Sequence, residues 1–204
     1  MIRSVVFRIV NILVFSFSFL LQTTAQSTSA EECIKSMMQQ TPVAGLSVAV
    51  VKNGKIIYTH SFGSKNIEAN TPLTDDCLFR IASISKSFSA TSIMQLAEQK
   101  KLSLEDDISD LVGFKIRNPK FPETAITLRM VMSHRSSIND KQGYFTLNAI
   151  NPDKNKDWAK CYNDYEPGTG YQYCNLNYNM IGTIIEKKSG ERFDRKLFDD
   201  TYSF

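Results

Sequence analysis

Residues Gly45–Gly63 read GLSVAVVKNGKIIYTHSFG, and this stretch predicts the first part of the fold. Two β-rich runs, Leu46–Lys52 and Lys55–Ser61, flank the dipeptide Asn53-Gly54. Asparagine and glycine both accept the positive φ angles that a tight two-residue turn requires, so Asn-Gly between such runs is the strongest short-range indication of a hairpin. The stretch therefore predicts two antiparallel strands.

The segments around this hairpin predict helices. Before it, AEECIKSMMQQ (residues 30–40) predicts a helix that ends at Thr41-Pro42, and after a loop over residues 64–82 the run from Ser83 to about Leu102 lacks Gly and Pro, which favours a helix. Three more are expected: a turn and short helix in LSLEDDISDLVG with solvated acids, a helix in ITLRMVMSHRSSI capped by Thr127, and one over Asn175–Gly190 ended by a glycine cap. Residues 139–167 have little periodicity, which predicts a long surface excursion that could border a binding cleft.

The N-terminal residues have the layout of a secretory signal peptide. MIRSVVFRIVNILVFSFSFLLQTTAQS has a basic start, an apolar run from about Ile9 to Leu21, and small residues at Thr23 and Ala25. The run is shorter than the ~20 residues with which a helix crosses a bilayer, so we expect cleavage after Ala25 and no stable membrane span afterwards. Two glutamates precede Cys33, so nothing here indicates a lipid-modified cysteine. The mature chain is expected to be exported, in the periplasm or secreted.

The charge and the composition indicate a globular protein that does not bind nucleic acid. The formal charge of +3 includes Arg3 and Arg8, and without them the mature chain would carry about +1, which argues against a nucleic-acid partner. With 42% hydrophobic and 22% charged residues, the chain is typical of a globular protein.

The cysteines leave the redox chemistry open. Cys33, Cys77, Cys161 and Cys174 remain after cleavage, in a compartment where disulfides persist, and the sequence does not choose among three possible pairings. There is no Cys-x-x-Cys and there are only two histidines, so we expect no zinc site. The sequence implies no other metal and no organic cofactor.

A candidate nucleophile lies in FRIASISKSFSA, residues Phe79–Ala90, as the Ser-x-x-Lys pair Ser83 and Lys86. The alternative is a helix-capping serine followed by a solvated lysine. One helical turn separates the two residues, so the lysine can reach the hydroxyl and act as its base if its pKa falls well below about 10.4. The positive potential of the helix N-terminus favours that change and also favours a developing oxyanion.

A second constellation, Tyr173-Cys174-Asn175, comes just before a predicted helix. A tyrosine near a cationic lysine is drawn toward phenolate and can relay protons, and an asparagine amide can accept from the lysine and donate to a substrate carbonyl. The alternative is a packed tyrosine and a helix-capping asparagine.

Taken together and in this order, these segments resemble the serine β-lactamase and penicillin-binding-protein superfamily, most closely its class C-like branch. GLSVAVVKNGKIIYTHSFG looks like the family's opening hairpin, and TPLTDDCLFRIASISKSFSATSIMQLAEQKKLSLEDDISDLV looks like its nucleophile helix and following turn. ITLRMVMSHRSSI and EPGTGYQYCNLNYNMIGTIIEKKSG resemble two further segments, so the likeness extends from about Thr41 onward. The resemblance implies an α+β fold, an antiparallel sheet combined with a helical region.

The resemblance also implies roles for four residues. Ser83 would be the acylated nucleophile, Lys86 its base, Tyr173 the proton relay to the leaving group and in deacylation, and Asn175 the residue that orients lysine and substrate. The backbone N–H of Ser83 would supply half of the oxyanion hole, and a later strand the other half.

Three departures from the family pattern stand out. Cys174 replaces the usual serine between tyrosine and asparagine, and Ser137 stands where glycine is common, while His134 is expected to be structural. The last motif, Lys-Thr-Gly or His-x-Gly, normally lies a hundred or more residues past Tyr-x-Asn. Lys188-Ser189-Gly190 is too close to Asn175, and we interpret it as a helix C-terminus. We therefore expect residues 26–204 to be the N-terminal part of the domain, a fragment without its C-terminal strands.

The leading hypothesis is an exported serine hydrolase that acts through an acyl-enzyme on β-lactams, D-amino-acid cell-wall peptides or small esters. One alternative is a non-catalytic homologue that binds cell-wall-like ligands without turnover, and another is an unrelated secreted domain with chance motifs. The leaving group, the rate of deacylation and the oligomeric state remain open, because substrate choice depends on loops and on the missing strands.

Overall fold

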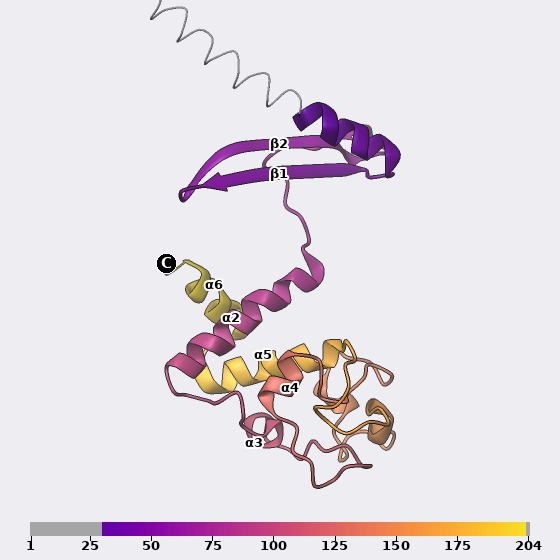
Figure 1. Ribbon diagram of the computed structural model, residues 1–204, viewed down its shortest axis with the longest axis vertical. Coiled ribbons are helices and arrows are strands. Elements are labelled where there is room, and N and C mark those ends of the chain that lie inside the picture. The colour runs from indigo at the N-terminus through magenta and orange to yellow at the C-terminus, as the bar shows by residue number, and fades with distance from the viewer. Residues whose placement is uncertain (1–29, 203–204) are drawn as a thin grey trace, which may run out of the picture. The chain divides into compact units, whose positions relative to one another are not determined.

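The computed structural model describes residues 30–202, and the predicted signal peptide, residues 1–25, lies outside them. The contacts divide the chain into two compact units, one ending at Arg80 and one beginning at Ile81. Figure 1 labels the helices and strands of both units.

The first unit contains the predicted hairpin. Residues 30–40 are helical, as expected, and strand β1 (Gly45–Lys52) pairs antiparallel with strand β2 (Lys55–Asn66), with a register irregularity after Val50. The turn has φ angles of 52° at Asn53 and 69° at Gly54, which are the positive values that make Asn-Gly a hairpin signal. The hairpin prediction is confirmed.

The loop predicted over residues 64–82 is partly wrong. Strand β2 continues to Asn66, and a short strand β3 (Thr71–Pro72) pairs with it, so the sheet has the order β1-β2-β3. Two asparagines stabilise the connecting turn, which contains no Asn-Gly pair. Asn66 Oδ1 accepts from the backbone N–H of Ala69 at 2.7 Å, and Asn70 adopts a left-handed conformation with a φ of 48°. This turn has no glycine, which is why the sequence did not indicate it.

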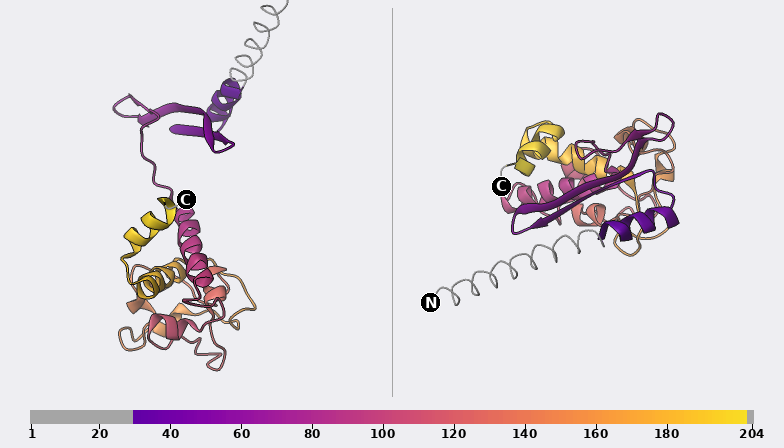
Figure 2. Two further views of the ribbon diagram at one scale, coloured as in Figure 1. Left: turned by 90° about the vertical axis from the view of Figure 1, so that its left-hand side faces the viewer. Right: turned by 90° about the horizontal axis from the view of Figure 1, so that it is seen from above.

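The second unit is helical. Its elements are a 3₁₀ turn η1 (Ala82–Ile84), helices α2 (Ser85–Glu98), α3 (Ile108–Val112) and α4 (Leu128–Met132), 3₁₀ turns η2 (Leu147–Ala149) and η3 (Trp158–Cys161), and helices α5 (Asn175–Ser189) and α6 (Phe193–Tyr202). Helix α5 contacts α2, α3, α4 and α6, and Figures 1 and 2 show it among these helices. The helical region and the antiparallel sheet of the first unit confirm the α+β class.

The core of the second unit forms where α2 and α5 present their apolar faces. On α2, the buried residues Ser89, Ser92, Ile93 and Leu96 recur at spacings of three and four, which places them on one face of the helix. On α5, the buried apolar residues are Leu176, Met180, Ile181, Ile184 and Ile185. Packing these two faces together brings the start of α2 and the start of α5 into the same region.

Helix α2 ends at Glu98, four residues before the predicted end at Leu102. Lys100 adopts a φ of 56°, its N–H donates to the carbonyl of Ala97, and the N–H of Lys101 donates to the carbonyl of Leu96. This is a Schellman ending, in which glycine normally occupies the left-handed position. A lysine occupies that position here, so the sequence carried no stop signal.

The other predicted helix ends agree with the structure. Thr127 Oγ1 accepts from the N–H of Met130 at the start of α4, and Gly190 closes α5 with a φ of 76°. Lys188-Ser189-Gly190 is therefore the C-terminus of α5, as interpreted from sequence. The predicted short helix is α3, whose preceding residue Asp107 caps it through Ser109 N–H and also pairs with Arg117, so this acid does not belong to a purely solvated face.

The predicted surface excursion over residues 139–167 is only partly at the surface. Ile150, Cys161 and Tyr162 are buried in the core, and Ile138 forms a β-bridge with Tyr162. The N–H of Asn139 donates to the carbonyl of Cys161 at 2.7 Å, which closes the segment into a loop with neighbouring ends. The apolar residues of this loop are too sparse to show a helical or strand period, although they reach the core.

The structure also bears on the membrane span and on the cysteine pairing. No helix within residues 30–202 is long and apolar enough to cross a membrane. All four cysteines lie within these residues as free thiols, so none of the three possible pairings is formed in the structure.

Leu96→Ala is expected to destabilise the protein by about 2–5 kcal/mol, because Leu96 is fully buried in the core and its truncation leaves a cavity. Glu98→Ala on the same helix is the matched control and should change the free energy of unfolding by less than about 0.5 kcal/mol, because Glu98 is exposed. Denaturant unfolding of the two variants measures the difference. Equal stability of both variants would contradict the packing of α2 into the core.

Candidate active site

The structure brings together all four candidate residues that the sequence singled out. Lys86 Nζ donates to Ser83 Oγ at 3.1 Å and to Asn175 Oδ1 at 2.9 Å, and Tyr173 OH donates to Ser83 Oγ at 2.7 Å. Some 90 residues of chain separate the two halves of this cluster. Ser83 and Tyr173 are exposed, whereas Lys86 and Asn175 are partly buried behind them.

The backbone explains why Ser83 faces Lys86. Ser83 lies in η1, directly before α2, and Lys86 is the second residue of α2, so the two side chains are one turn apart on the same side. Ala82 has a φ of 44°, a left-handed conformation that is unusual for a residue with a side chain. Strained backbone of this kind occurs preferentially at functional sites, and here it immediately precedes the candidate nucleophile.

Lys86 lies between aromatic rings as well as between polar partners. Its Nζ is 5.1 Å from the centre of the Tyr173 ring and 5.5 Å from the centre of the Tyr178 ring. Both distances are within the range of cation–π attraction. The Tyr178 hydroxyl donates to the carbonyl of Met132 at 3.2 Å, which holds that ring in place at the end of α4. The rings and the two oxygen partners together restrict where the ammonium group can go.

The environment of Tyr173 favours its phenolate form. The hydrogen bond with Lys86 and then the one with Ser83 lower the pKa of Tyr173 below its usual value of about 10. The nearby positive charge of Lys86 acts in the same direction. A tyrosine with a lowered pKa can take a proton and return it within a catalytic cycle.

A carboxylate that the sequence analysis did not single out supports the second half of the site. Asp140 Oδ2 accepts from Asn175 N–H at 2.8 Å and from Asn175 Nδ2 at 3.0 Å, and Oδ1 accepts from Leu176 N–H and Cys174 Sγ, each at 3.0 Å. Burial acts to raise the pKa of Asp140, but these donated hydrogen bonds outweigh it and hold the pKa below the usual range. Asp140 is therefore a carboxylate at the N-terminus of α5.

The unusual Cys174 fits this arrangement as a neutral donor. Its side chain is fully buried, and burial followed by the hydrogen bond to Asp140 raises the pKa of the thiol to about 12. The thiol donates to the carboxylate, as the hydroxyl of a serine can at the same place. The bond from the thiol goes to Asp140 and not to the candidate nucleophile Ser83.

The contacts of His134 are those of a supporting residue. Its Nδ1 accepts from the N–H of Cys174 at 3.2 Å, and its ring centre is 4.5 Å from that of Tyr173. Burial, followed by the charge of Lys86, lowers the pKa of His134, so the neutral ring that can accept at Nδ1 is favoured. The ring thus packs against the Tyr173 ring, which is a structural contact of the kind expected for this histidine.

The position of Ser137 explains why glycine is common there in the family it resembles. Ser137 has a φ of 61°, a left-handed conformation in which glycine has no steric cost. Its hydroxyl accepts from Asn118 Nδ2 at 3.0 Å inside the core, and its carbonyl accepts from Asn163 N–H. These bonds hold Ser137 in its left-handed conformation.

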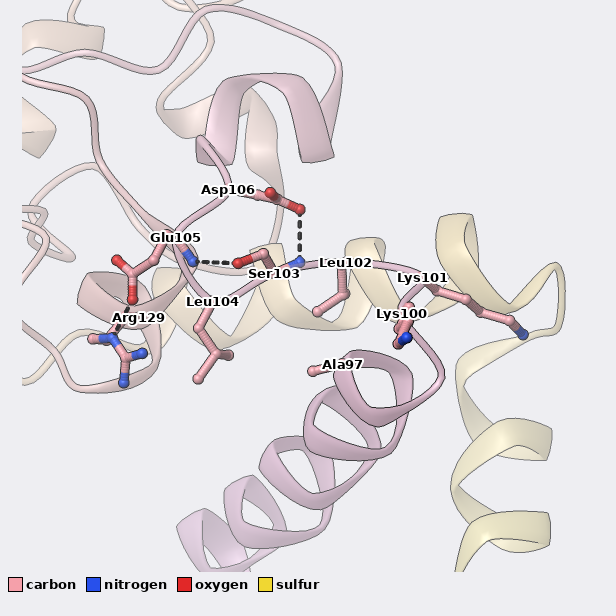
Figure 3. Close-up of a pocket in the computed structure, with 9 residues that line it drawn as sticks. All are labelled: Ala97, Lys100, Lys101, Leu102, Ser103, Leu104, Glu105, Asp106 and Arg129. Atoms are coloured by element: carbon pink, nitrogen blue, oxygen red, sulfur yellow. Dashed lines mark hydrogen bonds and ion pairs between the residues drawn. The ribbon is translucent and has the colours of Figure 1, made fainter.

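A wide cleft in this unit lies away from the candidate residues. It measures about 610 Å³ and lies beyond the end of α2, where none of the four candidate residues contributes to it. Figure 3 shows its walls bonded to one another: Arg129 pairs with Glu105, and Asp106 accepts from the backbone of Ser103. The hydrogen-bonded cluster at Ser83, and not the size of a cleft, therefore identifies the site.

As a chemical arrangement, the cluster is suited to nucleophilic catalysis. A hydroxyl, two groups able to hold its proton, and an amide that orients one of them are the parts that an activated serine needs. Two residues that support this cluster, Asp140 and Tyr178, were not predicted from the sequence. A single aspartate 35 residues before Asn175 has no local pattern, and Tyr178 reads as a packed helical residue.

Comparisons with known proteins agree with this geometry. The family model described as Beta-lactamase matches residues 30–202. Penicillin-binding protein 4* of Bacillus subtilis (strain 168) is 33% identical over 154 residues, which are 71% of this chain and 32% of that protein. Among solved structures, the octameric penicillin-binding protein homologue from Pyrococcus abyssi has a TM-score of 0.68 and 30% identity, with 85% of this chain and 41% of that chain covered.

A class C beta-lactamase in complex with cefoxitin is a further structural neighbour, with a TM-score of 0.66, 25% identity, and coverage of 87% of this chain and 47% of that one. The chain spans about a third of the length of the curated relatives that it matches. Because the family model covers most of the chain, and because homologues and neighbours of both kinds agree with it, the chain belongs to the serine β-lactamase and penicillin-binding-protein superfamily.

Proposed function

We propose that the protein to which this chain belongs is an exported serine hydrolase that works through an acyl-enzyme at Ser83. The observation that carries the proposal is the double hydrogen bond at Ser83 Oγ, from Lys86 Nζ at 3.1 Å and from Tyr173 OH at 2.7 Å. The superfamily generally consists of serine hydrolases, which supports a reaction of this class. Export rests on the N-terminal sequence alone.

In the proposed acylation step, Ser83 Oγ forms a bond to the substrate carbonyl carbon. Its proton passes to the Lys86–Tyr173 pair, which must hold one base, either neutral Lys86 or the Tyr173 phenolate. The bond from the carbonyl carbon to the leaving nitrogen or oxygen then breaks, and Tyr173 delivers the proton to that atom. Water releases the acyl group by the reverse sequence, with Tyr173 again relaying the proton.

The substrates proposed are carbonyl compounds with a reactive amide or ester: β-lactams, D-amino-acid peptides of the cell wall, or small esters. Support comes from the neighbours, which include a class C beta-lactamase in complex with cefoxitin and a D-amino acid amidase. The four-residue cluster alone does not select among these compounds, because all of them react at a carbonyl carbon and substrate choice depends on residues outside the cluster.

Ser83→Ala is expected to abolish covalent labelling of the full-length protein by a fluorescent penicillin or a fluorophosphonate, because no other group replaces the nucleophilic oxygen. Intact-mass spectrometry checks that one adduct forms on the wild-type protein and none on the variant. Ser87→Ala is the matched control, since Ser87 lies on α2 and its hydroxyl is bonded to the carbonyl of Ile84. Equal labelling of wild type and Ser83→Ala would refute the assignment, and ligand binding without any labelling would favour a non-catalytic homologue.

Lys86→Met is expected to move the ionisation of Tyr173 to higher pH. Lys86 is the largest cause of the lowered pKa of Tyr173, through its hydrogen bond and its charge, so removing it raises that pKa toward the usual value of about 10. The tyrosinate absorbance of wild type minus that of Tyr173→Phe isolates this residue, and the same difference in the Lys86→Met background gives its pKa without Lys86. Identical midpoints in both backgrounds would show that Lys86 does not control Tyr173.

A further inference from the structure

One carboxylate organises three consecutive residues at the start of α5. Asp140 accepts the backbone N–H groups of Asn175 and Leu176, the side-chain amide of Asn175 and the thiol of Cys174, all between 2.8 and 3.0 Å. Asp140 is distant from these residues in sequence and does not belong to α5. Its contacts are therefore tertiary interactions that depend on the fold around residues 134–140.

The bond to the Asn175 side chain has a chemical consequence for Lys86. A primary amide accepts hydrogen bonds at its oxygen and donates them from its NH₂ group, and a rotation of the side-chain amide by 180° exchanges the two positions. An ionised carboxylate can only accept, and an ammonium group can only donate. With Nδ2 bonded to Asp140 at 3.0 Å, Oδ1 is left to accept from Lys86 Nζ at 2.9 Å, and the rotated amide would lose both bonds.

We propose that Asp140 is a positioning residue for the reaction at Ser83. It holds the Asn175 amide in the one orientation that keeps Lys86 Nζ within reach of Ser83 Oγ, and it acts through Asn175 without contacting the substrate. Its bonds from two backbone N–H groups and from the Cys174 thiol hold the Asp140 carboxylate in place beside the Asn175 amide. The inference rests on the proposed function, because it assigns a role within that reaction.

A double-mutant cycle with Asp140→Asn and Asn175→Ala tests the proposal. The full-length protein and its variants are labelled with a fluorescent penicillin over a range of concentrations, which separates the binding constant from the rate constant of acylation. Asp140→Asn should lower the acylation rate constant about 10- to 100-fold and leave the binding constant nearly unchanged, because a small displacement of a catalytic group has an effect of this size. Asp164→Asn, which removes an exposed carboxylate of the same loop, should label at the wild-type rate.

The cycle distinguishes a positioning role from a merely structural one. If Asp140 acts through Asn175, then Asp140→Asn adds less than about threefold once Asn175 is alanine. Two losses that multiply in the double variant would show that Asp140 acts independently and would overturn the proposal. A wild-type acylation rate in Asp140→Asn would overturn it as well.

Two further arms keep the result interpretable. Asp140→Glu keeps the negative charge at the helix N-terminus but moves the carboxylate oxygens by one methylene group. This variant replaces Asp140→Asn if Asp140→Asn does not fold. A lower acylation rate constant in Asp140→Glu then supports the proposal, and a wild-type rate constant overturns it. Labelling that persists in Ser83→Ala would instead refute the proposed function and with it the role of Asp140. Labelling that depends on Ser83 but not on Asp140 would refute only this inference.

Discussion

The packing of α2 against α5 is the constraint on which the candidate site depends. Each helix carries one half of the polar cluster at its start and an apolar face along its length, and burial of these faces is what brings residues 86 and 175 within hydrogen-bond distance. Burial of apolar area is favourable but non-directional, so it can set helices side by side without selecting a polar geometry. The polar geometry comes from directional bonds made at the helix ends.

Those directional bonds form a chain from the core outward to Ser83. Asp140 is bonded to Asn175, Asn175 to Lys86, and Lys86 to Ser83, so that each group restricts the next. The partly buried end of the chain is held by several bonds, whereas Ser83 and Tyr173 at its outer end are exposed. This gradient suits a nucleophile that must meet a substrate while its supporting groups stay fixed.

The departures from the family pattern are compensated locally. The thiol of Cys174 is kept neutral by burial and still donates to Asp140, so the replaced serine costs the arrangement no hydrogen bond. Ser137 keeps the left-handed backbone that glycine would adopt more easily, and its hydroxyl and carbonyl both have partners. Neither change replaces Ser83 or one of the three candidate residues around it.

The sequence alone determined the features that arise from local chemistry: the Asn53-Gly54 hairpin, the presence of helices α2 and α5, the Thr127 and Gly190 caps, and the candidates Ser83, Lys86, Tyr173 and Asn175. It did not predict strand β3 or the end of α2, because an asparagine and a lysine take the left-handed positions where glycine is the usual signal. Only the tertiary structure decided the place of Asp140 and Tyr178. Their partners lie far away along the chain, and no local pattern can encode a hydrogen bond between segments that meet only after the core has formed.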